Sequence, residues 1–379
     1  MSRIMKRVAL LVHSANWSGY EQGLYELLIR WNRSPAPIVY LAEEGILSDK
    51  LREHGIAVRI LPMDAYKRGS SNREKGYLGI MGTLKYARRL SQDFKHDQIE
   101  CVHANTNTLY TMVYGSIAAK WAHLPLIWYV QKSIAAPYLN QTTAAMIRTF
   151  FRYIPDGIMV NSLSTLASLK LPPQKMSRVQ LIYPSYSGEY GRMIGISPDP
   201  AYITVLLVGR LAEWKGQHLL LAAAKAFLPD RKVRFWLVGA EQYEETVYRE
   251  MLQHQIRSNG LTNITLFGYM EDLKSIIHQA DILLHTNMGP EPFNQVILQA
   301  MAAGIPIIAS NIGGPMEVIK DGETGILFPP GDIGALRRSI RWMINHPDER
   351  EEMGLKGMAR VKNYFTIELS LQRIMDYYQ

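Results

Sequence analysis

Short apolar segments that alternate with longer amphipathic ones are the feature that most constrains the fold of this chain. In the first half, strands are predicted at Arg7–His13, Ile38–Ala42, Ala57–Leu61, Ile99–His103, Leu126–Val130, Gly157–Asn161 and Val179–Tyr183. The helices between them include Gly19–Trp31, Tyr77–Phe94, Leu109–Ala122 and Thr142–Tyr153. Several strands are apolar along their whole length, which is typical of a parallel sheet covered by helices on both faces. The alternation therefore predicts a doubly wound α/β domain.

The alternation stops between Pro184 and Pro200, where Ser, Gly, Tyr and Pro predict a linker. A second series follows, with strands at Ile203–Val208, Val233–Val238, Ile264–Phe267, Ile282–His285, Ile305–Ala309 and Gly325–Phe328. Its helices are Gln217–Phe227, Glu244–Ser258, Leu273–Gln279, Phe293–Ala303 and further ones from Ile333 to the end. We predict two Rossmann-like domains in tandem, at residues 1–190 and 191–360. Residues 361–379 are predicted to form a helix that crosses back to the first domain.

Composition excludes several classes of protein. The single cysteine, Cys101, excludes an internal disulfide framework and a zinc cluster. No apolar run approaches the ~18 residues of a membrane span. The charged residues Arg3, Lys6 and Arg7 lead straight into the first strand, so we expect no signal peptide. These features predict a protein of the cytoplasm.

Positive charge is concentrated in the first half of the chain. Residues 1–190 hold 23 Lys and Arg against 13 Asp and Glu, whereas residues 191–379 hold 19 against 21. A basic domain beside a nearly neutral one indicates an anionic partner for the first domain. The alternative is that the basic surface only keeps the protein in solution.

The motifs of several enzyme classes are missing from the sequence. No G-x-G-x-x-G follows a strand and no P-loop lysine motif occurs, so a dinucleotide oxidoreductase or a P-loop enzyme is not predicted. There is no Asp-x-Asp to hold a metal between phosphates, no H-E-x-x-H and no G-x-S-x-G. Candidate chemistry is concentrated instead in two segments of the second half.

The first segment runs from Val208 to Gly216, where a parallel strand gives way to a helix. Ligands of α/β folds bind at this edge of the sheet. Arg210 offers a planar fork for phosphate oxygens and Lys215 a point charge on a long stem. Two cations within one turn of a helix N-terminus indicate a diphosphate site. The alternative is a pair of surface cations. That alternative fits poorly with the flanking glycines, which are expected to let a ligand approach the backbone closely.

The second segment runs from Gly289 to Gly304, after the strand Ile282–His285. Pro292 suits a first helical turn, so the free N–H groups of Phe293 and Asn294 are expected to face an anion. A carboxylate beside phosphates is unfavourable, so Glu291 is expected to accept hydrogen bonds from sugar hydroxyls. The alternative for Glu291 is a charged residue that caps an ordinary helix.

Together these segments resemble the donor-binding half of glycosyltransferase family 4, the retaining members of the glycosyl transferases group 1 with the GT-B fold. The resemblance covers Ile203 to about Asp348 and is carried by G-R-x(4)-K-G (Gly209 to Gly216), Phe267-Gly268-Tyr269, Ala280-Asp281, Glu291-Pro292-Phe293, Ala300-Met301-Ala302 with Gly304-Ile305-Pro306, Gly313-Gly314 with Glu317, and Asp321-Gly322 with Thr324-Gly325. The first half resembles the family more weakly, in the order of its elements.

The resemblance implies a cleft between the two domains and assigns a role to each. The second domain would bind a nucleotide sugar, a UDP- or GDP-sugar, and the first would bind the acceptor. Arg210, Lys215 and Glu291 are the implied catalytic residues, with the two cations on the donor diphosphate and Glu291 on the sugar hydroxyls. The backbone at Phe293 and Asn294 would meet the phosphate. The nucleobase would contact Phe267, Gly268 and Tyr269. No cofactor and no metal are implied.

This chain departs from the family pattern at several positions. The family has a second glutamate eight residues after Glu291, and this chain has Gln299, which keeps a carbonyl acceptor for the ribose but loses the charge. Gly19 follows Ser18 where the family has a Gly-Gly loop, and it is expected to approach the diphosphate. Gln131 and Lys132 stand where the family often has a histidine, so they are candidates to bind the acceptor. His103 is another candidate, with a buried structural role as the alternative.

The sequence thus predicts a hexosyltransferase that moves a sugar to a hydroxyl acceptor. That acceptor is a glycan or lipid-linked sugar, or a small cyclitol or secondary-metabolite core. The surplus charge fits an anionic acceptor or peripheral attachment to the inner face of the membrane, through Lys67, Arg68, Arg73 and Lys75 and through the helix that carries Lys85, Arg88 and Arg89. The alternatives are a nucleotide-sugar epimerase, a phosphorylase, or a non-catalytic module for an anionic polymer. Nucleic acid is not an expected partner, since few aromatic residues accompany the basic ones.

Overall fold

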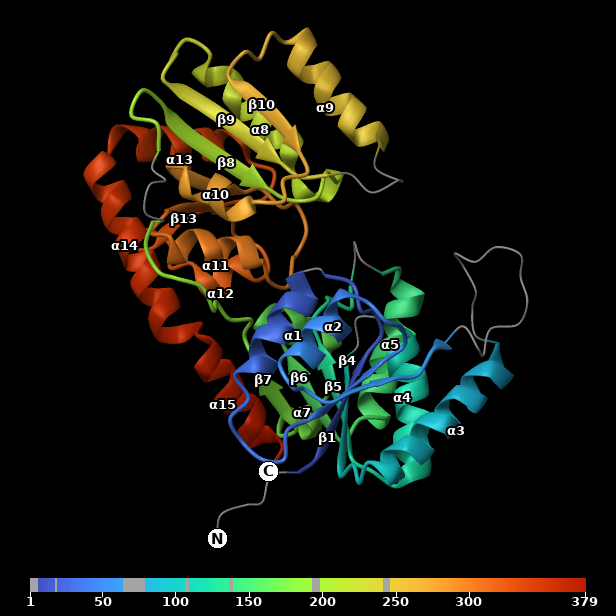
Figure 1. The fold of residues 1–379 in the computed structure, drawn as a ribbon. Coiled ribbons are helices and arrows are strands. Elements are labelled where there is room, and N and C mark those ends of the chain that lie inside the picture. The colour runs from blue at the N-terminus through green and yellow to red at the C-terminus, as the bar shows by residue number, and fades with distance from the viewer. Residues whose placement is uncertain are drawn as a thin grey trace. The chain divides into compact units, whose positions relative to one another are not determined.

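The computed structural model of the chain describes residues 6–17, 19–63, 79–105, 109–135, 139–192, 198–240 and 246–379. Lys67, Arg68, Arg73 and Lys75 lie outside these residues. The chain forms two compact units (Figure 1), one of residues Met1–Pro184 with Ile367–Gln379 and one of residues Ser185–Thr366. The predicted divisions were at residues 190/191 and 360/361.

Unit 1 is built on a parallel sheet in the order β3-β2-β1-β4-β5-β6-β7. Its strands are β1 Val8–Val12, β2 Ile38–Leu41, β3 Val58–Ile60, β4 Cys101–Asn105, β5 Leu126–Val130, β6 Gly157–Val160 and β7 Val179–Leu181. Its helices are α1 Gly19–Ile29, α2 Ile46–Glu53, α3 Ile80–His96, α4 Leu109–Ala122, α5 Gln141–Tyr153, α6 Leu163–Leu169, α7 Pro173–Met176 and α15 Ile367–Tyr377. Each predicted strand of the first half is present.

Two helix layers cover the sheet of unit 1, and each has its own core. Tyr86 and Phe94 of α3 and Phe151 of α5 pack with Trp128 of β5 on one face. On the other face, α1, α2 and α15 pack against alternate side chains of the same strands. Because successive residues of a strand point to opposite faces, an apolar strand can fill both cores at once.

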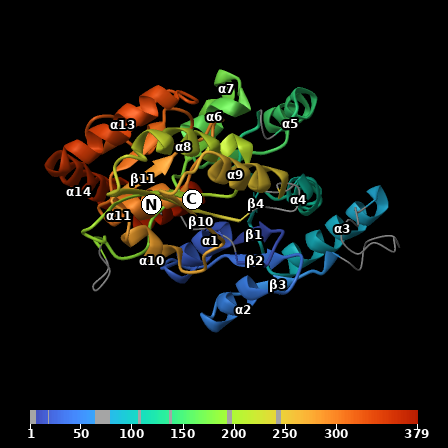
Figure 2. The ribbon, with the colours of Figure 1, turned by 90° about the horizontal axis from the view of Figure 1, so that it is seen from above.

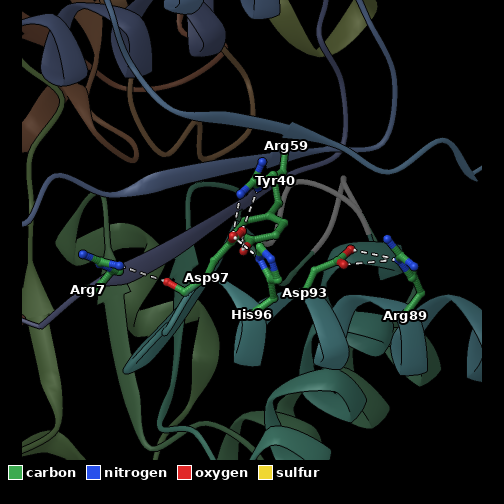
Figure 3. Close-up of polar contacts among 7 residues, drawn as sticks. All are labelled: Arg7, Tyr40, Arg59, Arg89, Asp93, His96 and Asp97. Carbon is green, nitrogen blue, oxygen red and sulfur yellow. Dashed lines mark hydrogen bonds and ion pairs between the residues drawn. The ribbon is translucent and has the colours of Figure 1, made fainter.

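The carboxylate of Asp97 joins the end of α3 to β2 and β3 (Figure 3). It accepts hydrogen bonds from the Tyr40 hydroxyl at 2.7 Å and from Nε and Nη2 of Arg59 at 2.8 and 2.6 Å. His96 Nδ1 lies 3.1 Å from the same carboxylate. The hydrogen bonds from Arg59 hold the pKa of Asp97 well below its usual range, against the effect of burial.

The last helix, α15, completes the core of unit 1. Leu371, Ile374 and Met375 are buried in the α1–α2 layer, and the Ser370 hydroxyl donates to the Tyr183 carbonyl at 2.8 Å. The Tyr377 hydroxyl accepts from the N–H of Ile158 at 3.0 Å. Residues at the two ends of the sequence therefore build one hydrophobic core.

Unit 2 has a six-stranded parallel sheet in the order β10-β9-β8-β11-β12-β13. Its strands are β8 Ile203–Val208, β9 Val233–Val238, β10 Ile264–Gly268, β11 Ile282–His285, β12 Ile307–Ser310 and β13 Gly325–Phe328. Its helices are α8 Gln217–Ala224, α9 Thr246–Ser258, α10 Leu273–His278, α11 Gln295–Ala302, α12 Pro315–Val318, α13 Ile333–Asn345 and α14 Pro347–Tyr364, with 3₁₀ turns at Glu213–Lys215 and Lys225–Phe227. The strand order reverses between β8 and β11, which places a topological switch point there.

The prediction of two Rossmann-like parallel-sheet domains is confirmed. Within the described ranges, every helix is too short or too polar to cross a bilayer.

Candidate functional site

The two segments singled out in the sequence follow β8 and β11, which are neighbours in the sheet of unit 2. β8 and β11 pair in parallel, with Leu207 opposite Leu284. Their following loops therefore leave the sheet side by side at its carboxyl edge. In open α/β sheets this crevice at the switch point is the place where ligands bind.

Lys215 and Glu291 meet at this edge. The Lys215 ammonium donates a hydrogen bond to Oε1 of Glu291 and forms an ion pair with it. The two side chains are only 9% and 15% exposed, so the pair is largely removed from water. Two of the three predicted catalytic residues are thus in direct contact. In this state the Lys215 ammonium is engaged by a carboxylate of the protein itself.

The second oxygen of Glu291 is held by three further donors. Oε2 lies 2.8 Å from Nε2 of His285, 2.8 Å from Nδ2 of Asn287 and 3.0 Å from Nδ2 of Asn294. Burial by itself raises the pKa of Glu291, but Lys215 and His285 together hold it well below its usual range. The Glu291 carboxylate is therefore ionised at neutral pH and fixed in orientation.

The indole of Trp214 lies near both predicted phosphate-binding cations. The Lys215 ammonium is 4.5 Å from the ring centroid, and the Arg210 guanidinium carbon is 5.9 Å from it. Both distances are within the range of a cation–π interaction. The Arg210 side chain is exposed, unlike that of Lys215. One aromatic ring thus contacts a buried cation and an exposed one.

The 3₁₀ turn that carries Lys215 is fastened to the loop after β11. The Thr286 hydroxyl donates to the carbonyl of Lys215 at 2.9 Å, and the N–H of Met288 donates to the carbonyl of Trp214 at 2.8 Å. Gly216 has φ +72°, and a Cβ there would lie 2.1 Å from the Thr286 carbonyl oxygen. The glycine is therefore required by the approach of Thr286, whereas the sequence suggested that it admits a ligand.

The helix α11 begins later than predicted. It starts at Gln295, and Asn294 caps it through its side chain, which accepts from the N–H of Val296 at 2.9 Å. Pro292 therefore precedes the helix and is not in its first turn. The backbone N–H groups of Phe293 and Asn294 also lie before the helix. The side chain of Asn294 caps α11 through its oxygen and donates to the Glu291 carboxylate through its nitrogen.

The predicted nucleobase residues lie at the end of β10. Phe267 packs edge-on against Trp236 with ring centroids 5.4 Å apart, Gly268 has φ +76°, and Tyr269 is 76% exposed. Phe267 and Gly268 line a cavity of about 250 Å³ between β10 and α9, which Arg249 and Arg257 also border. Gln299 lies half-buried on α11.

The candidates in unit 1 differ in their surroundings. Gly19 opens α1 with open space around its Cα, and Lys132 is exposed. Gln131 is half-buried, and its carbonyl accepts from Nδ2 of Asn161 at 3.1 Å.

His103 is buried in the core of unit 1, where Nδ1 forms a hydrogen bond with the hydroxyl of Tyr378. Burial lowers the pKa of His103 to about 3, so the ring is neutral. This placement fits the structural alternative for His103 and not a role with the acceptor.

Sequence reasoning did not identify three residues of the site, namely His285, Asn287 and Trp214. His285 ends a predicted strand and Asn287 follows it, so their position at the carboxyl edge was available as a signal. Trp214 lies beside Lys215 in the segment already singled out. His285 and Asn287 contact Glu291, and Trp214 contacts the cations, only because of how the loops fold. No spacing of residues in the sequence indicates these contacts.

Comparisons with known proteins concern the family and the fold of the chain. The glycosyl transferases group 1 family model matches residues 196–360. Human alpha-1,3/1,6-mannosyltransferase ALG2 is 32% identical over 277 residues, which cover 68% of this chain and 66% of ALG2. The 2-deoxystreptamine N-acetyl-D-glucosaminyltransferase of Niallia circulans is 25% identical over 84% of this chain and 85% of its own length. The chain spans 41% to 85% of the length of the first curated relatives it matches.

A solved structure shares the whole fold. Anabaena HepE, crystallised with UDP and glucose, superposes with a TM-score of 0.80 at 23% identity, over 98% of each chain. The family match covers the unit that holds the Lys215–Glu291 pair, and the fold match covers both units. The chain therefore has the GT-B fold, and its residues 196–360 belong to the glycosyl transferases group 1 family.

Proposed function

We propose that this protein is a retaining glycosyltransferase of family 4 that moves a sugar from a nucleotide-diphosphate sugar to a hydroxyl acceptor without a metal ion. The observation that carries the proposal is the buried contact of Lys215 with Glu291 at the switch point of unit 2. A cation for a diphosphate and an acceptor for sugar hydroxyls lie next to each other there. A nucleotide sugar presents these two groups on either side of the bond that is to break.

The cations are proposed to act on the leaving group. Breaking the bond between the anomeric carbon and the diphosphate oxygen leaves negative charge on the diphosphate. Lys215 and the exposed Arg210 are placed to stabilise this charge, which is the kind of interaction that contributes most to such steps. Trp214 holds the two cations over one ring and so limits the rearrangement that they need.

Glu291 is proposed to orient the donor sugar. Its Oε2 is already taken by three N–H donors, so a sugar hydroxyl would donate to Oε1. Because the carboxylate is held in its ionised form, we assign it no proton-transfer role. In the proposed reaction the acceptor oxygen attacks from the face that the diphosphate leaves, and the acceptor proton passes to the leaving phosphate. This assigns retention of configuration without a second carboxylate.

The donor and acceptor are proposed by analogy with the relatives. UDP was found with Anabaena HepE, which supports a UDP-sugar, with a GDP-sugar as the alternative. The names of ALG2 and of the Niallia circulans enzyme describe transfer of mannose and of N-acetylglucosamine, the latter to a cyclitol amine. They support a hexose or acetamidohexose donor and a glycan, lipid-linked sugar or cyclitol acceptor.

A donor panel followed by product analysis tests the proposal. Purified protein is incubated with UDP- and GDP-sugars, first alone and then with pools of acceptors, in buffer with and without a chelator. We expect slow donor hydrolysis, transfer on addition of an acceptor, retention of anomeric configuration by NMR, and unchanged rates with the chelator. Glu291→Ala should lower kcat by ~10²-fold or more, since it removes contacts to the sugar.

Other outcomes would overturn the proposal. An isomerised nucleotide sugar without acceptor would identify an epimerase, and a dependence on inorganic phosphate would identify a phosphorylase. Binding of polyanions with no turnover of any donor would indicate a non-catalytic module. A product with inverted anomeric configuration would support a glycosyltransferase but reject the retaining mechanism.

A further inference from the structure

The two helix layers of unit 1 differ sharply in charge. Between Glu100 and Glu189 the sequence contains seven Lys and Arg but one acidic residue, Asp156. Asp156 is held by the sheet, because its carboxylate accepts from the N–H of Leu126 at 2.9 Å. This stretch supplies α4, α5 and α6 of one layer. The opposite layer, made of α1, α2 and α15, carries the carboxylates of Glu21, Glu26, Asp49, Glu53, Glu368 and Asp376.

The same layer exposes large apolar side chains. Tyr153 is 79% exposed, Leu163 51% and Met146 49%. Val113 and Trp121 of α4 are exposed as well. On α1, α2 and α15 the exposed large apolar side chains are Ile46 and Leu369. Single exposed apolar residues are common on any protein, but a group of them on three successive helices that carry no carboxylate is not explained by chance exposure.

These residues lie on one continuous surface. The helices α4, α5 and α6 follow β4, β5 and β6, which are consecutive neighbours in the sheet, so the helices lie next to one another. Figure 2 shows α4 and α5 along the same side of unit 1. Arg148 of α5 also donates to the Ser168 carbonyl of α6 at 2.8 Å. We call this the α4–α6 surface, defined by Val113, Lys120, Trp121, Met146, Arg152, Tyr153, Leu163 and Lys170.

We infer that the α4–α6 surface docks the protein on an anionic lipid bilayer. Its exposed cations, Lys120, Arg152 and Lys170, have no carboxylate on the same helices to neutralise them, so they complement anionic headgroups. Between them stand methionine, leucine and valine, which can insert among acyl chains, and Trp121 and Tyr153, which suit the interface. A hydrated polyanion would use the cations but leave the apolar side chains in water. This inference does not depend on the transfer reaction.

Co-sedimentation with vesicles tests the inference with the full-length protein. The parent should sediment with vesicles of phosphatidylglycerol and phosphatidylcholine and remain in solution with phosphatidylcholine alone. A charge variant, Lys120→Ser with Arg152→Ser and Lys170→Ser, should bind about 100-fold more weakly at low ionic strength, given the usual contribution of a basic residue near an anionic surface. An apolar variant, Trp121→Ser with Met146→Ser and Tyr153→Ser, should lose at least ~10-fold at both low and high salt.

Matched variants in unit 2 serve as controls. Met316→Ser with Leu355→Ser and Tyr364→Ser removes three apolar side chains of similar exposure, and Arg231→Ser with Lys232→Ser and Lys362→Ser removes three exposed cations. Both controls should bind vesicles as the parent does, and donor hydrolysis should be the same in all variants.

Four results would overturn the inference. The first is a parent that does not sediment with anionic vesicles, and the second is an equal loss of binding in the unit 2 controls. The third is an apolar variant that sediments with anionic vesicles like the parent, with heparin displacing both proteins from the vesicles. This result would assign the surface to a soluble polyanion. A parent that elutes as a dimer and an apolar variant that elutes as a monomer would assign the surface to a second copy of the chain.

Discussion

Glu291 has more hydrogen-bond partners than a substrate-binding carboxylate needs in the absence of substrate. Lys215 contacts Oε1, and His285, Asn287 and Asn294 contact Oε2. A nucleoside diphosphate that binds Lys215 must therefore compete with Glu291 for the ammonium. In the proposed function the carboxylate would have opposite effects on the two halves of the donor, because it would compete with the diphosphate for Lys215 while it accepts hydrogen bonds from the sugar.

A single substitution should separate these two effects. In Glu291→Gln the Lys215 ammonium loses its internal counter-ion, so UDP should bind as tightly as to the parent or about 10-fold more tightly, given that contacts to charged groups are worth ~1.5–3 kcal/mol. Turnover of a UDP-sugar should fall, because the amide is a weaker acceptor for sugar hydroxyls. Calorimetric titration with UDP and steady-state kinetics measure the two quantities.

Glu213→Gln is the matched control for this experiment. Glu213 is an exposed carboxylate in the same turn, two residues before Lys215. Its substitution should leave UDP affinity and turnover unchanged. Weaker binding of UDP to Glu291→Gln would contradict the idea that Glu291 competes for Lys215.

At the residue scale, the sequence predicts a site residue when a chemically active side chain directly follows a recognisable strand. Lys215 and Glu291 were predicted because each follows an apolar strand, and the parallel sheet then brings such ends together. His285 and Asn287 were missed, because a histidine and an asparagine beside a strand are common and their bonds to Glu291 depend on how the loop folds back. The start of α11 was also missed, because Pro292 suggested a first turn while Asn294 supplies the cap.

At the scale of elements, the end of α3 shows how one side chain can join three segments. Asp97 is buried, and it accepts bonds from Tyr40 of β2 and Arg59 of β3. The strand β3 is short and lies at the edge of the sheet, so it has backbone partners on one side only. Asp97 therefore compensates for the limited pairing of this strand.

We expect Asp97→Ala to destabilise unit 1 by about 2–4 kcal/mol, because it leaves the buried Tyr40 hydroxyl without its acceptor and frees Arg59. The pKa of Asp97 is lowered in the folded state, so its contribution is present above the pKa of an unfolded aspartate and is lost as the pH falls below it. Urea unfolding at neutral and acidic pH measures both effects.

Asp93→Ala provides the comparison on the same helix. Asp93 is half-buried and pairs with the exposed Arg89 on α3, so its loss should cost at most ~0.5 kcal/mol. Equal destabilisation by the two substitutions would mean that the contacts of Asp97 contribute no more to the free energy of unfolding than the Arg89–Asp93 pair does.

Most elements could be predicted because their apolar patterns are long or dense. The strands are nearly all apolar, and the structure places all thirteen predicted strands, with bounds that differ by a few residues at most. The helices α2, α6, α7 and α12 were not predicted. They have eight residues or fewer, and neighbouring elements stabilise them.

At the scale of the whole molecule, the C-terminal residues belong to the core that the N-terminal strands begin. Tyr378 is 1% exposed, and its hydroxyl bonds the buried ring of His103. The sequence predicted a helix that crosses back to the first domain, but it could not show that Tyr378, the residue after this helix, bonds a histidine. That contact links a titratable group in β4 to the last turn of the chain.

The stability of unit 1 should therefore depend on pH between about 6.5 and 3. His103 has a pKa of about 3 when folded and about 6.5 when unfolded, so the unfolded chain binds the proton more readily in this window. The free energy of unfolding is highest above the unfolded pKa and should fall by ~2 kcal/mol between pH 6.5 and pH 5 on account of this residue. Hydrogen exchange of β4 and β5 peptides in urea reports on unit 1 alone.

His103→Gln should flatten this part of the profile, because glutamine retains an acceptor for Tyr378 and does not titrate. His54→Gln, at an exposed position next to α2, is the control for the loss of one histidine. A profile for His103→Gln that is as steep as the parent's would show that other groups cause the loss of stability.

The discontinuity of unit 1 has a consequence for biosynthesis. Residues 185–366 separate its first 184 residues from its last thirteen, and those thirteen include Tyr378. A ribosome therefore releases the seven strands of unit 1 long before α15, which completes the cover of one of their faces, whereas unit 2 is formed by an uninterrupted stretch. Part of one apolar face of nascent unit 1 stays uncovered until α15 has been made. A premature stop between unit 2 and α15 therefore yields one finished domain and one that chaperones and proteases can recognise as incomplete.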